Sequence, residues 1–203
     1  MKKSILNHFQ KSDPVIYKYL NEVKILDWIS VNKNASEHDY FVSLTKKIIY
    51  QQLSNKAAST IYSRFEKVLN GKVTPHSIIK TKTEKFREAG VSQQKTGYLL
   101  DLSQKFLNKE LNLENIKNLK DDEIINELVK VKGIGRWSAE MFLIFDLGRE
   151  DVFSFGDQGL KNAIKNIYKP KDLSEKTINK IISKWSPFKT YGSIALWHSL
   201  DNL

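Results

Sequence analysis

The sequence contains no cysteine, and this absence excludes several kinds of site. A chain without thiols forms no disulfide, holds no thiolate-bound zinc and ligates no iron–sulfur cluster through cysteine. Apolar runs are short, and none approaches the roughly 18 residues that a membrane-spanning helix needs. The segment MKKSILNHFQ lacks the apolar core and cleavage site of a signal peptide. We therefore expect a protein inside the cell, with no targeting signal and no membrane partner.

Strand patterns are also nearly absent. Only EDVFSF, residues 150–155, shows a doubtful alternation of apolar and polar residues. Elsewhere apolar residues recur at helical spacing between capping signals, as in the stripe that follows Ser36 and Asp39. The pattern predicts an all-α protein of roughly ten helices.

Acidic residues are outnumbered by basic ones. The 33 lysines and arginines against 23 aspartates and glutamates give a net charge of +10 and a pI near 9.5. Such an excess favours a polyanionic partner, although a basic protein can also be merely soluble. The length of 203 residues suits one large domain or two small ones, and we expect two compact lobes.

The stretch VKGIGRWSAEMF, residues 131–142, interrupts the helical pattern with two glycines. A dinucleotide-binding fingerprint would need a preceding strand and a third glycine, but Ser138 occupies that place. The remaining interpretation is helix, tight turn, helix. Glycines expose the turn amides at the N-terminus of the next helix, which suits a phosphate. The residues expected at a DNA backbone are Lys132, Gly133, Ile134, Gly135 and Arg136; the alternative is an ordinary helix–helix turn.

The stretch ELVKVKGIGRWSAEMF resembles the helix–hairpin–helix motif of a DNA glycosylase superfamily, HhH-GPD, which also carries a Gly/Pro-rich loop and a catalytic aspartate. The segment DVFSFGDQGLKNAI is similar to that loop. Further matches, IIYQQLSNKAASTIYSRF, AGVSQQKTGYL and KWSPFKTYGSIALWHSL, are similar to DNA-3-methyladenine glycosylase II, the AlkA type. The resemblance implies two helical lobes, residues 36–135 and residues 1–35 plus 136–203, with a DNA cleft between them.

The resemblance assigns catalysis to Asp157. Cleavage of an N-glycosidic bond develops positive charge on the sugar, and a nearby carboxylate can stabilise it and orient water. The bland alternative is that Asp157 only caps a helix, and both roles are compatible. Trp137 stands where relatives that also cut the backbone carry a Schiff-base lysine, so simple hydrolysis is expected.

An aromatic pocket would suit a cationic alkylated purine. By resemblance its walls are Trp137 and Trp197, with Tyr191 and Trp185 in support nearby. The alternative for each tryptophan is core packing, and for Trp185 it is the better interpretation. Met141 departs from the family pattern, because an aromatic residue is expected there, and this puts the substrate range in doubt.

The polar corner, QQLSN at residues 51–55, lies between two predicted helices. In relatives the corresponding turn enters the minor groove, and a side chain must fill the gap that an extruded base leaves. Matching places Gln52 at the intercalating position, with Leu53 adjacent and Ser54 able to touch base edges. The alternative is that Leu53 belongs to the core and Gln52 is an exposed helix end.

The resemblance also implies a possible sodium or potassium ion in the hairpin, held by main-chain carbonyls of Val129, Val131 and Ile134. No other cofactor is expected, and the four histidines show no metal-binding spacing.

The sequence thus predicts a monomeric, monofunctional N-glycosylase that flips and hydrolyses alkylated purines, such as 3-methyladenine and 7-methylguanine, from damaged double-stranded DNA in base excision repair. It would act in the cytoplasm at the nucleoid, or in the nucleus of a eukaryote. Two alternatives stay open: a non-catalytic helix–hairpin–helix DNA-binding protein, and a glycosylase with lyase action on oxidised bases.

Overall fold

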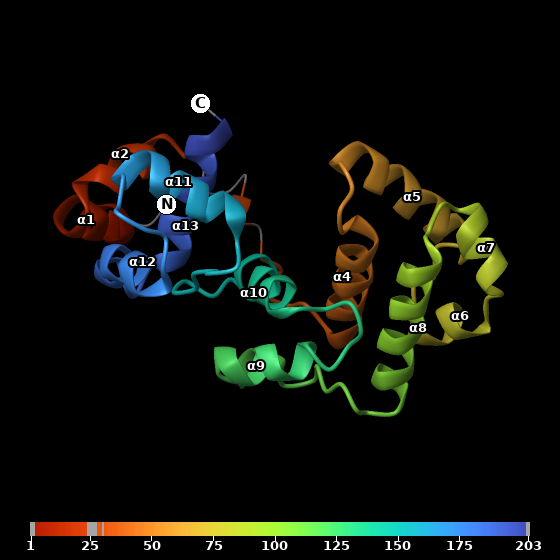
Figure 1. The fold of residues 1–203 in the computed structure, drawn as a ribbon. Coiled ribbons are helices and arrows are strands. Elements are labelled where there is room, and N and C mark those ends of the chain that lie inside the picture. Colours follow the sequence, from red (N-terminus) through yellow and green to blue (C-terminus); the bar gives the residue numbers. More distant parts are fainter. Residues whose placement is uncertain (1–2, 24–27, 30, 202–203) are drawn as a thin grey trace. The chain divides into compact units, whose positions relative to one another are not determined.

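A computed structural model describes residues 3–23, 28, 29 and 31–201 (Figure 1). Within these residues there are twelve α-helices, two short 3₁₀ helices and no strand, so the predicted all-α class is confirmed. The doubtful segment EDVFSF is irregular and forms part of a loop. No helix in the described ranges has the length and apolar character that would let it cross a membrane.

The chain divides into two compact units, residues 1–31 with 140–203, and residues 32–139. The predicted lobe boundaries differ from these by a few residues on each side. Helix α10, Arg136–Phe145, contains the second boundary.

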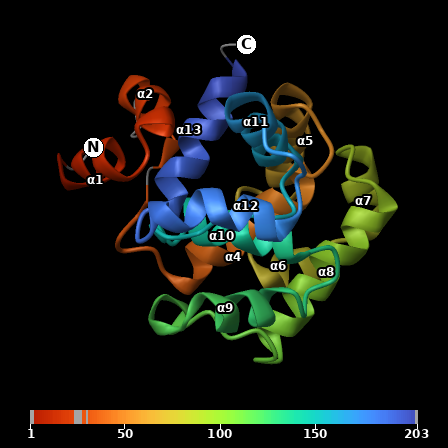
Figure 2. The ribbon, with the colours of Figure 1, turned by 60° about the vertical axis from the view of Figure 1, so that its left-hand side comes forward.

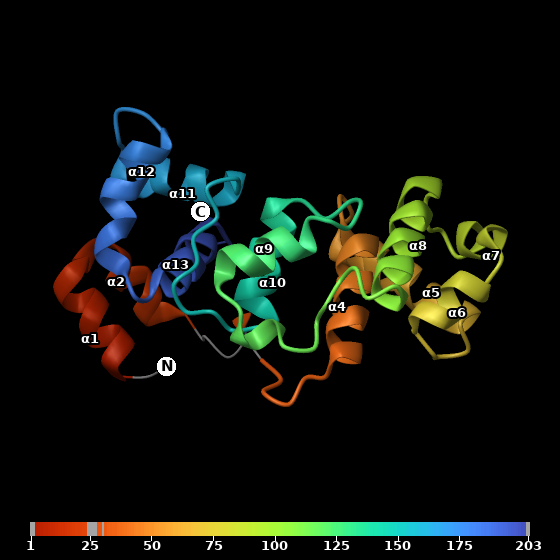
Figure 3. The ribbon, with the colours of Figure 1, turned by 90° about the horizontal axis from the view of Figure 1, so that it is seen from below.

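The unit of residues 32–139 contains six α-helices and one 3₁₀ helix. Their bounds are α4 Glu37–Tyr50, α5 Asn55–Val68, α6 Pro75–Lys80, α7 Thr83–Glu88, α8 Gln93–Leu107, η1 Ile116–Asn118 and α9 Asp121–Leu128. Helix α8 packs along α4 and α6, and α7 lies beside it (Figure 3). Aromatic pairs lie among the aliphatic residues of the core, with Phe41 against Phe106 and Phe65 against Phe86.

The other unit combines both ends of the described chain. Its further helices are α1 Lys3–Ser12, α2 Pro14–Glu22, α11 Gln158–Tyr168, α12 Glu175–Ile182, η2 Ser183–Trp185 and α13 Lys189–Asp201. Helix α13 packs against both α2 and α11 (Figure 2). The core of this unit contains Phe9, Leu196 and the fully buried Trp185. Trp185 therefore packs in the core, which is the interpretation that the sequence favoured.

Capping chemistry sets many of the helix starts. Ser36 and Asp39 form the predicted capping box, with the Asp39 carboxylate accepting from the Ser36 amide at 2.7 Å. Ser92 caps α8 and Ser174 caps α12, as their positions in the sequence indicate. Helix α1 was not predicted as a separate helix, although Ile5 and Phe9 lie one turn apart and are both buried.

Candidate functional site

The hairpin turn, residues 129–135, joins α9 to α10. Gly133 has a φ of +84°, and a Cβ atom there would lie 2.1 Å from Cδ2 of Tyr98. Gly135 differs, because no heavy atom would lie within 4 Å of its Cβ. Within the described part of the chain, the amides of Gly133 and Gly135 donate to no protein acceptor. The turn therefore offers two amides and open space, which together suit an anion.

The neighbours of the two glycines differ in exposure. Lys132 and Arg136 are exposed, and the Arg136 guanidinium lies 3.8 Å from the carboxylate of Asp122 in a solvent-exposed ion pair of little energetic weight. The side chain of Ile134 is buried, and its amide donates to the Val131 carbonyl at 3.0 Å. A ligand that binds at Ile134 would therefore contact the main chain of this residue and not its side chain.

The three carbonyls named for a monovalent cation belong to this turn. The Val131 carbonyl accepts from the Ile134 amide and retains a second lone pair, while the Val129 side chain is exposed. Neutral carbonyl oxygens on a tight turn are suitable ligands for such an ion. Among the described residues there is no group of three or more acidic, histidine or cysteine side chains that could hold a metal.

The polar corner connects α4 to α5 in the same unit as the hairpin turn. Gln52, Leu53 and Ser54 are all exposed, so Leu53 does not belong to the core. Gln52 has a φ of +57°, a left-handed conformation that is uncommon for a residue with a side chain. The Ser54 hydroxyl caps α5, at 3.4 Å from the Ala57 amide.

Gln51 was not among the predicted site residues, yet its side chain connects the polar corner to the hairpin turn. Its Nε2 atom donates to the Gly133 carbonyl at 2.8 Å, across 82 residues of sequence. The bond fixes the Gly133–Ile134 peptide, which borders the free amides. Nothing in the local sequence pattern indicates this partner, because neighbouring Gln52 has the same side chain and is exposed.

In the other unit, Asp157 is 8% exposed and stands at the N-cap of α11. Its Oδ1 atom accepts from the Leu160 amide at 2.8 Å and from Nε1 of Trp197 at 3.2 Å. Asp157 therefore does cap a helix, as the alternative interpretation of this residue held. These two donors fix the carboxylate in one orientation beside an aromatic side chain.

Trp197 is half-buried and lies in an aromatic stack. Trp28 lies parallel to it, with ring centroids 6.3 Å apart and an interplanar angle of 4°, and Phe145 lies 5.9 Å away at 28°. Trp28 and Phe145 were not among the predicted site residues. Trp197 therefore couples an aromatic cluster to the carboxylate of Asp157.

The remaining predicted pocket residues are distributed differently. Trp137 is 47% exposed on α10 and belongs to the unit of residues 32–139. Met141 is buried. The Tyr191 hydroxyl donates to Glu150 at 2.8 Å, and burial together with this bond raises the pKa of Tyr191. A pocket shared by Trp137 and Asp157 stays a prediction.

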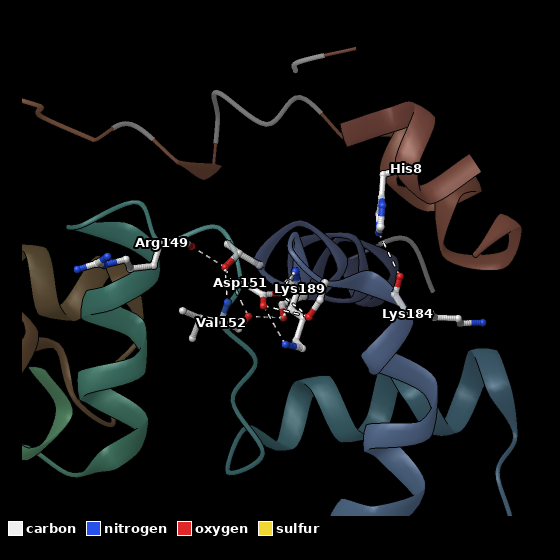
Figure 4. Close-up of polar contacts among 9 residues, drawn as sticks. His8, Arg149, Asp151, Val152, Lys184 and Lys189 are labelled. Carbon is white, nitrogen blue, oxygen red and sulfur yellow. Dashed lines mark hydrogen bonds and ion pairs between the residues drawn. The ribbon is translucent and has the colours of Figure 1, made fainter. Parts of the chain in front are cut away.

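The aspartate loop, residues 146–157, is fastened to the start of α13 (Figure 4). Asp151 accepts from the Lys189 amide at 3.1 Å and pairs with its ammonium at 3.0 Å. The Thr190 hydroxyl donates to the Arg149 carbonyl at 2.6 Å and accepts from the Val152 amide at 3.0 Å. An irregular segment thus has a fixed path.

A buried pair holds the end of the loop nearest Asp157. The hydroxyl of Ser154, which is fully buried, donates to the carboxylate of buried Glu140 on α10. The Ser154 carbonyl in turn accepts from the Asp157 amide at 3.2 Å. Neither Ser154 nor Glu140 was expected at the site, because a serine in a loop and a glutamate in a helix are common without any special role.

Comparison with known proteins places these features in a family context. Residues 45–188 match the family described as "HhH-GPD superfamily base excision DNA repair protein". DNA-3-methyladenine glycosylase 1 of Schizosaccharomyces pombe is 30% identical over 179 residues, covering 86% of this chain and 78% of that protein.

Two solved structures are similar over nearly the whole chain. DNA-3-methyladenine glycosidase from Bacillus halodurans has a TM-score of 0.79 at 30% identity, covering 97% of this chain and 88% of that one. The 3-methyladenine DNA glycosylase of Schizosaccharomyces pombe, in complex with abasic DNA, has a TM-score of 0.79 at 28% identity, covering 98% and 97%.

Proposed function

This chain belongs to the HhH-GPD superfamily of base excision DNA repair proteins, and we propose that it is a monofunctional DNA glycosylase for alkylated purines. It hydrolyses the N-glycosidic bond of bases such as 3-methyladenine and leaves an abasic site. The relatives named above as 3-methyladenine glycosylases support the substrate class. Its partner is damaged double-stranded DNA, which it binds as a monomer.

The observation that carries the proposal is the setting of Asp157. A carboxylate that two donors hold at a helix N-terminus is fixed before substrate arrives. As the base departs, positive charge develops on the sugar, and a preorganised carboxylate stabilises this charge without rearranging. The same carboxylate can orient the attacking water and accept its proton.

Base departure also depends on the substrate. Alkylation at a ring nitrogen makes the purine cationic, so it leaves without needing much protonation and stacks well on electron-rich rings. The aromatic cluster around Trp197 and the exposed indole of Trp137 are the side chains available for that stacking. Trp137 also leaves the family's Schiff-base position without an amine, which favours hydrolysis over strand cleavage.

The hairpin turn would grip the DNA backbone. Its two free amides and the exposed Lys132 and Arg136 suit a phosphate, and Gln52, Leu53 and Ser54 are exposed where a gap-filling side chain is required. A monovalent cation at the carbonyls of Val129, Val131 and Ile134 would stiffen this turn. The proposal includes no iron–sulfur cluster and places the protein with the chromosomal DNA, in the cytoplasm or in a eukaryotic nucleus.

The test is release of 3-methyladenine from methylated duplex DNA by the wild type and by Asp157→Asn. Asparagine caps a helix as well as aspartate does, so the fold should persist while the charge is lost. We expect single-turnover release to fall by at least about 100-fold, the scale of a lost electrostatic contribution. Asp172→Asn, at an aspartate in the loop before α12, is the matched control and should release base at the wild-type rate.

Three other outcomes would each contradict the proposal in a different way. Unchanged release by Asp157→Asn contradicts the mechanism. Duplex binding by the wild type without any base release would indicate a non-catalytic DNA-binding protein. A protein–DNA adduct trapped with borohydride would indicate a glycosylase with lyase action and would contradict the role given to Trp137.

A further inference from the structure

Helix α8 contacts both the polar corner and the hairpin turn from one of its faces. Three side chains on it, Lys95, Tyr98 and Asp101, are spaced three residues apart and so follow one another along the helix. Each makes a contact with a residue distant in sequence. Lys95 meets the end of α4, whereas Tyr98 and Asp101 meet the hairpin turn.

Lys95 holds the polar corner at its first residue. Its ammonium donates to the carbonyls of Ile49 at 2.7 Å and Gln51 at 2.8 Å. Both carbonyls belong to the C-terminal end of α4, where the last carbonyls have no partner within the helix and the dipole favours a cation. Burial lowers the pKa of Lys95, in keeping with an ammonium that has exchanged part of its water for these carbonyls.

Asp101 and Tyr98 hold the hairpin turn. The Asp101 carboxylate accepts from the Lys132 amide at 2.8 Å and from the Lys105 ammonium at 2.8 Å. Burial acts to raise the pKa of Asp101, but the bonds from Lys105 and Lys132 outweigh it, and the pKa is lowered. The Tyr98 ring occupies the space that a side chain at Gly133 would need.

The two turns are also joined directly, because Gln51 lies in both sets of contacts. Its carbonyl accepts from Lys95, and its side chain donates to Gly133. Lys95, Gln51 and Gly133 therefore form a continuous path from α8 through the corner to the hairpin.

We propose that Lys95 is a positioning residue which, through Gln51, locks the polar corner to the hairpin turn as one preformed block. The inference rests on the proposed function, in which the hairpin grips a phosphate and the corner fills the gap of the flipped base. A block assembled in advance fixes the gap-filling residue relative to the phosphate, so binding energy is not used to order the corner. Loss of the lock should impair base flipping more than phosphate binding.

The experiment compares two substrates that differ in their need for the gap-filling residue. One carries 3-methyladenine or 7-methylguanine paired in a duplex, and the other carries the same base opposite a one-nucleotide gap, where no pair has to be broken. Lys95→Met removes both hydrogen bonds and keeps most of the length of the side chain. We expect its single-turnover release to fall by about 10- to 100-fold on the paired substrate and far less on the gapped one.

Two controls separate positioning from charge and from folding. Lys80→Met removes an exposed lysine on α6, in the same unit, and should act on both substrates like the wild type. Gln51→Met breaks only the link to Gly133, so it should show the same selective loss as Lys95→Met; it decides the question if Lys95→Met unfolds. Thermal unfolding of every variant is measured alongside.

The outcomes of the two proposals are distinguishable. No release by the wild type from either substrate refutes the proposed function itself. If the wild type is active and both Lys95→Met and Gln51→Met release base from the paired substrate at the wild-type rate, the lock is overturned. A folded variant that loses activity equally on both substrates also overturns it, because a lock on the corner predicts a difference between them.

Discussion

Gly133 and Gly135 flank one isoleucine, yet different physical constraints act on them. Gly133 combines a left-handed φ of +84° with the Tyr98 ring at the place of its missing side chain. Gly135 has neither constraint, and its missing side chain leaves open space beside a free amide. The first glycine is therefore required by the fold, and the second by the ligand that we propose.

Alanine at each position should separate these requirements. Gly133→Ala should lower the free energy of unfolding by about 2 kcal/mol or more, because alanine resists this φ and its methyl group meets Tyr98. Gly135→Ala should leave stability within about 0.5 kcal/mol and weaken duplex binding, because its methyl group would occupy the phosphate's approach. Urea unfolding and fluorescence anisotropy with duplex DNA measure the two effects. Equal loss of stability in both variants would contradict this division.

At the scale of elements, the aspartate loop shows how an irregular segment becomes rigid. Its first half is held by α13 through Asp151 and Thr190, and its second half by the buried pair of Ser154 and Glu140. Asp157 lies three residues after Ser154 in the sequence and caps α11. The position of the carboxylate thus depends on bonds made by residues that would not touch the substrate.

Ser154→Ala tests that dependence. The variant removes one donor from the buried Glu140 carboxylate, which should cost about 1–3 kcal/mol of stability. We expect kcat for base release to fall by about tenfold with little change in duplex affinity, because the hairpin turn is untouched. The comparison is Ser63→Ala, at an exposed serine on α5 that should change neither quantity. A fall in affinity without a fall in kcat would rule out a positioning role for Ser154.

Local chemistry made most elements predictable. Four capping side chains each accept from the amide three residues further on, so their effect is visible in the sequence: Ser36, Ser92, Asp157 and Ser174. The all-α class was predicted from the helical spacing of the apolar residues. Helix α1 escaped prediction because its two buried residues form a short apolar face without a capping signal.

Contacts between distant residues could not be predicted in this way. Gln51 and Gly133 are 82 residues apart, and either glutamine of the polar corner could have been the partner. The stack of Trp28 on Trp197 likewise depends on how the N-terminal segment packs. Sequence patterns located both turns, but only the three-dimensional structure shows which side chains join them.

At the scale of the whole molecule, one buried carboxylate ties the N-terminal helices to the C-terminal ones. Asp13 is fully buried and caps α2. It accepts from Nε1 of Trp185 at 2.7 Å and from the Tyr168 hydroxyl at 2.7 Å, and the Lys184 ammonium lies 3.2 Å away. Burial and the bond to Asp13 raise the pKa of Tyr168. The His8 ring makes a further link, to the Lys184 carbonyl at 3.1 Å (Figure 4).

Asp13→Ala should therefore destabilise the unit formed by residues 1–31 and 140–203. Loss of the carboxylate leaves the buried Trp185 indole and the partly buried Tyr168 hydroxyl without their acceptor, and we expect a loss of about 3–5 kcal/mol in the free energy of unfolding. Differential scanning calorimetry should show a lowered transition for this unit and an unchanged one for residues 32–139. Asp13→Asn, which keeps one acceptor oxygen, should lose less. A single transition at the wild-type temperature would contradict this role of Asp13.

One unit is formed by a continuous stretch of the chain and the other by two separate stretches, and this affects the order in which they fold during synthesis. Residues 32–139 are continuous, so the hairpin turn, the polar corner and α8 can fold as soon as they leave the ribosome. The helices α1 and α2 are made first but complete their core only when α13 arrives. A nascent chain would thus become able to bind nucleic acid before Asp157 contacts Trp197. Catalysis would be the last property that it acquires.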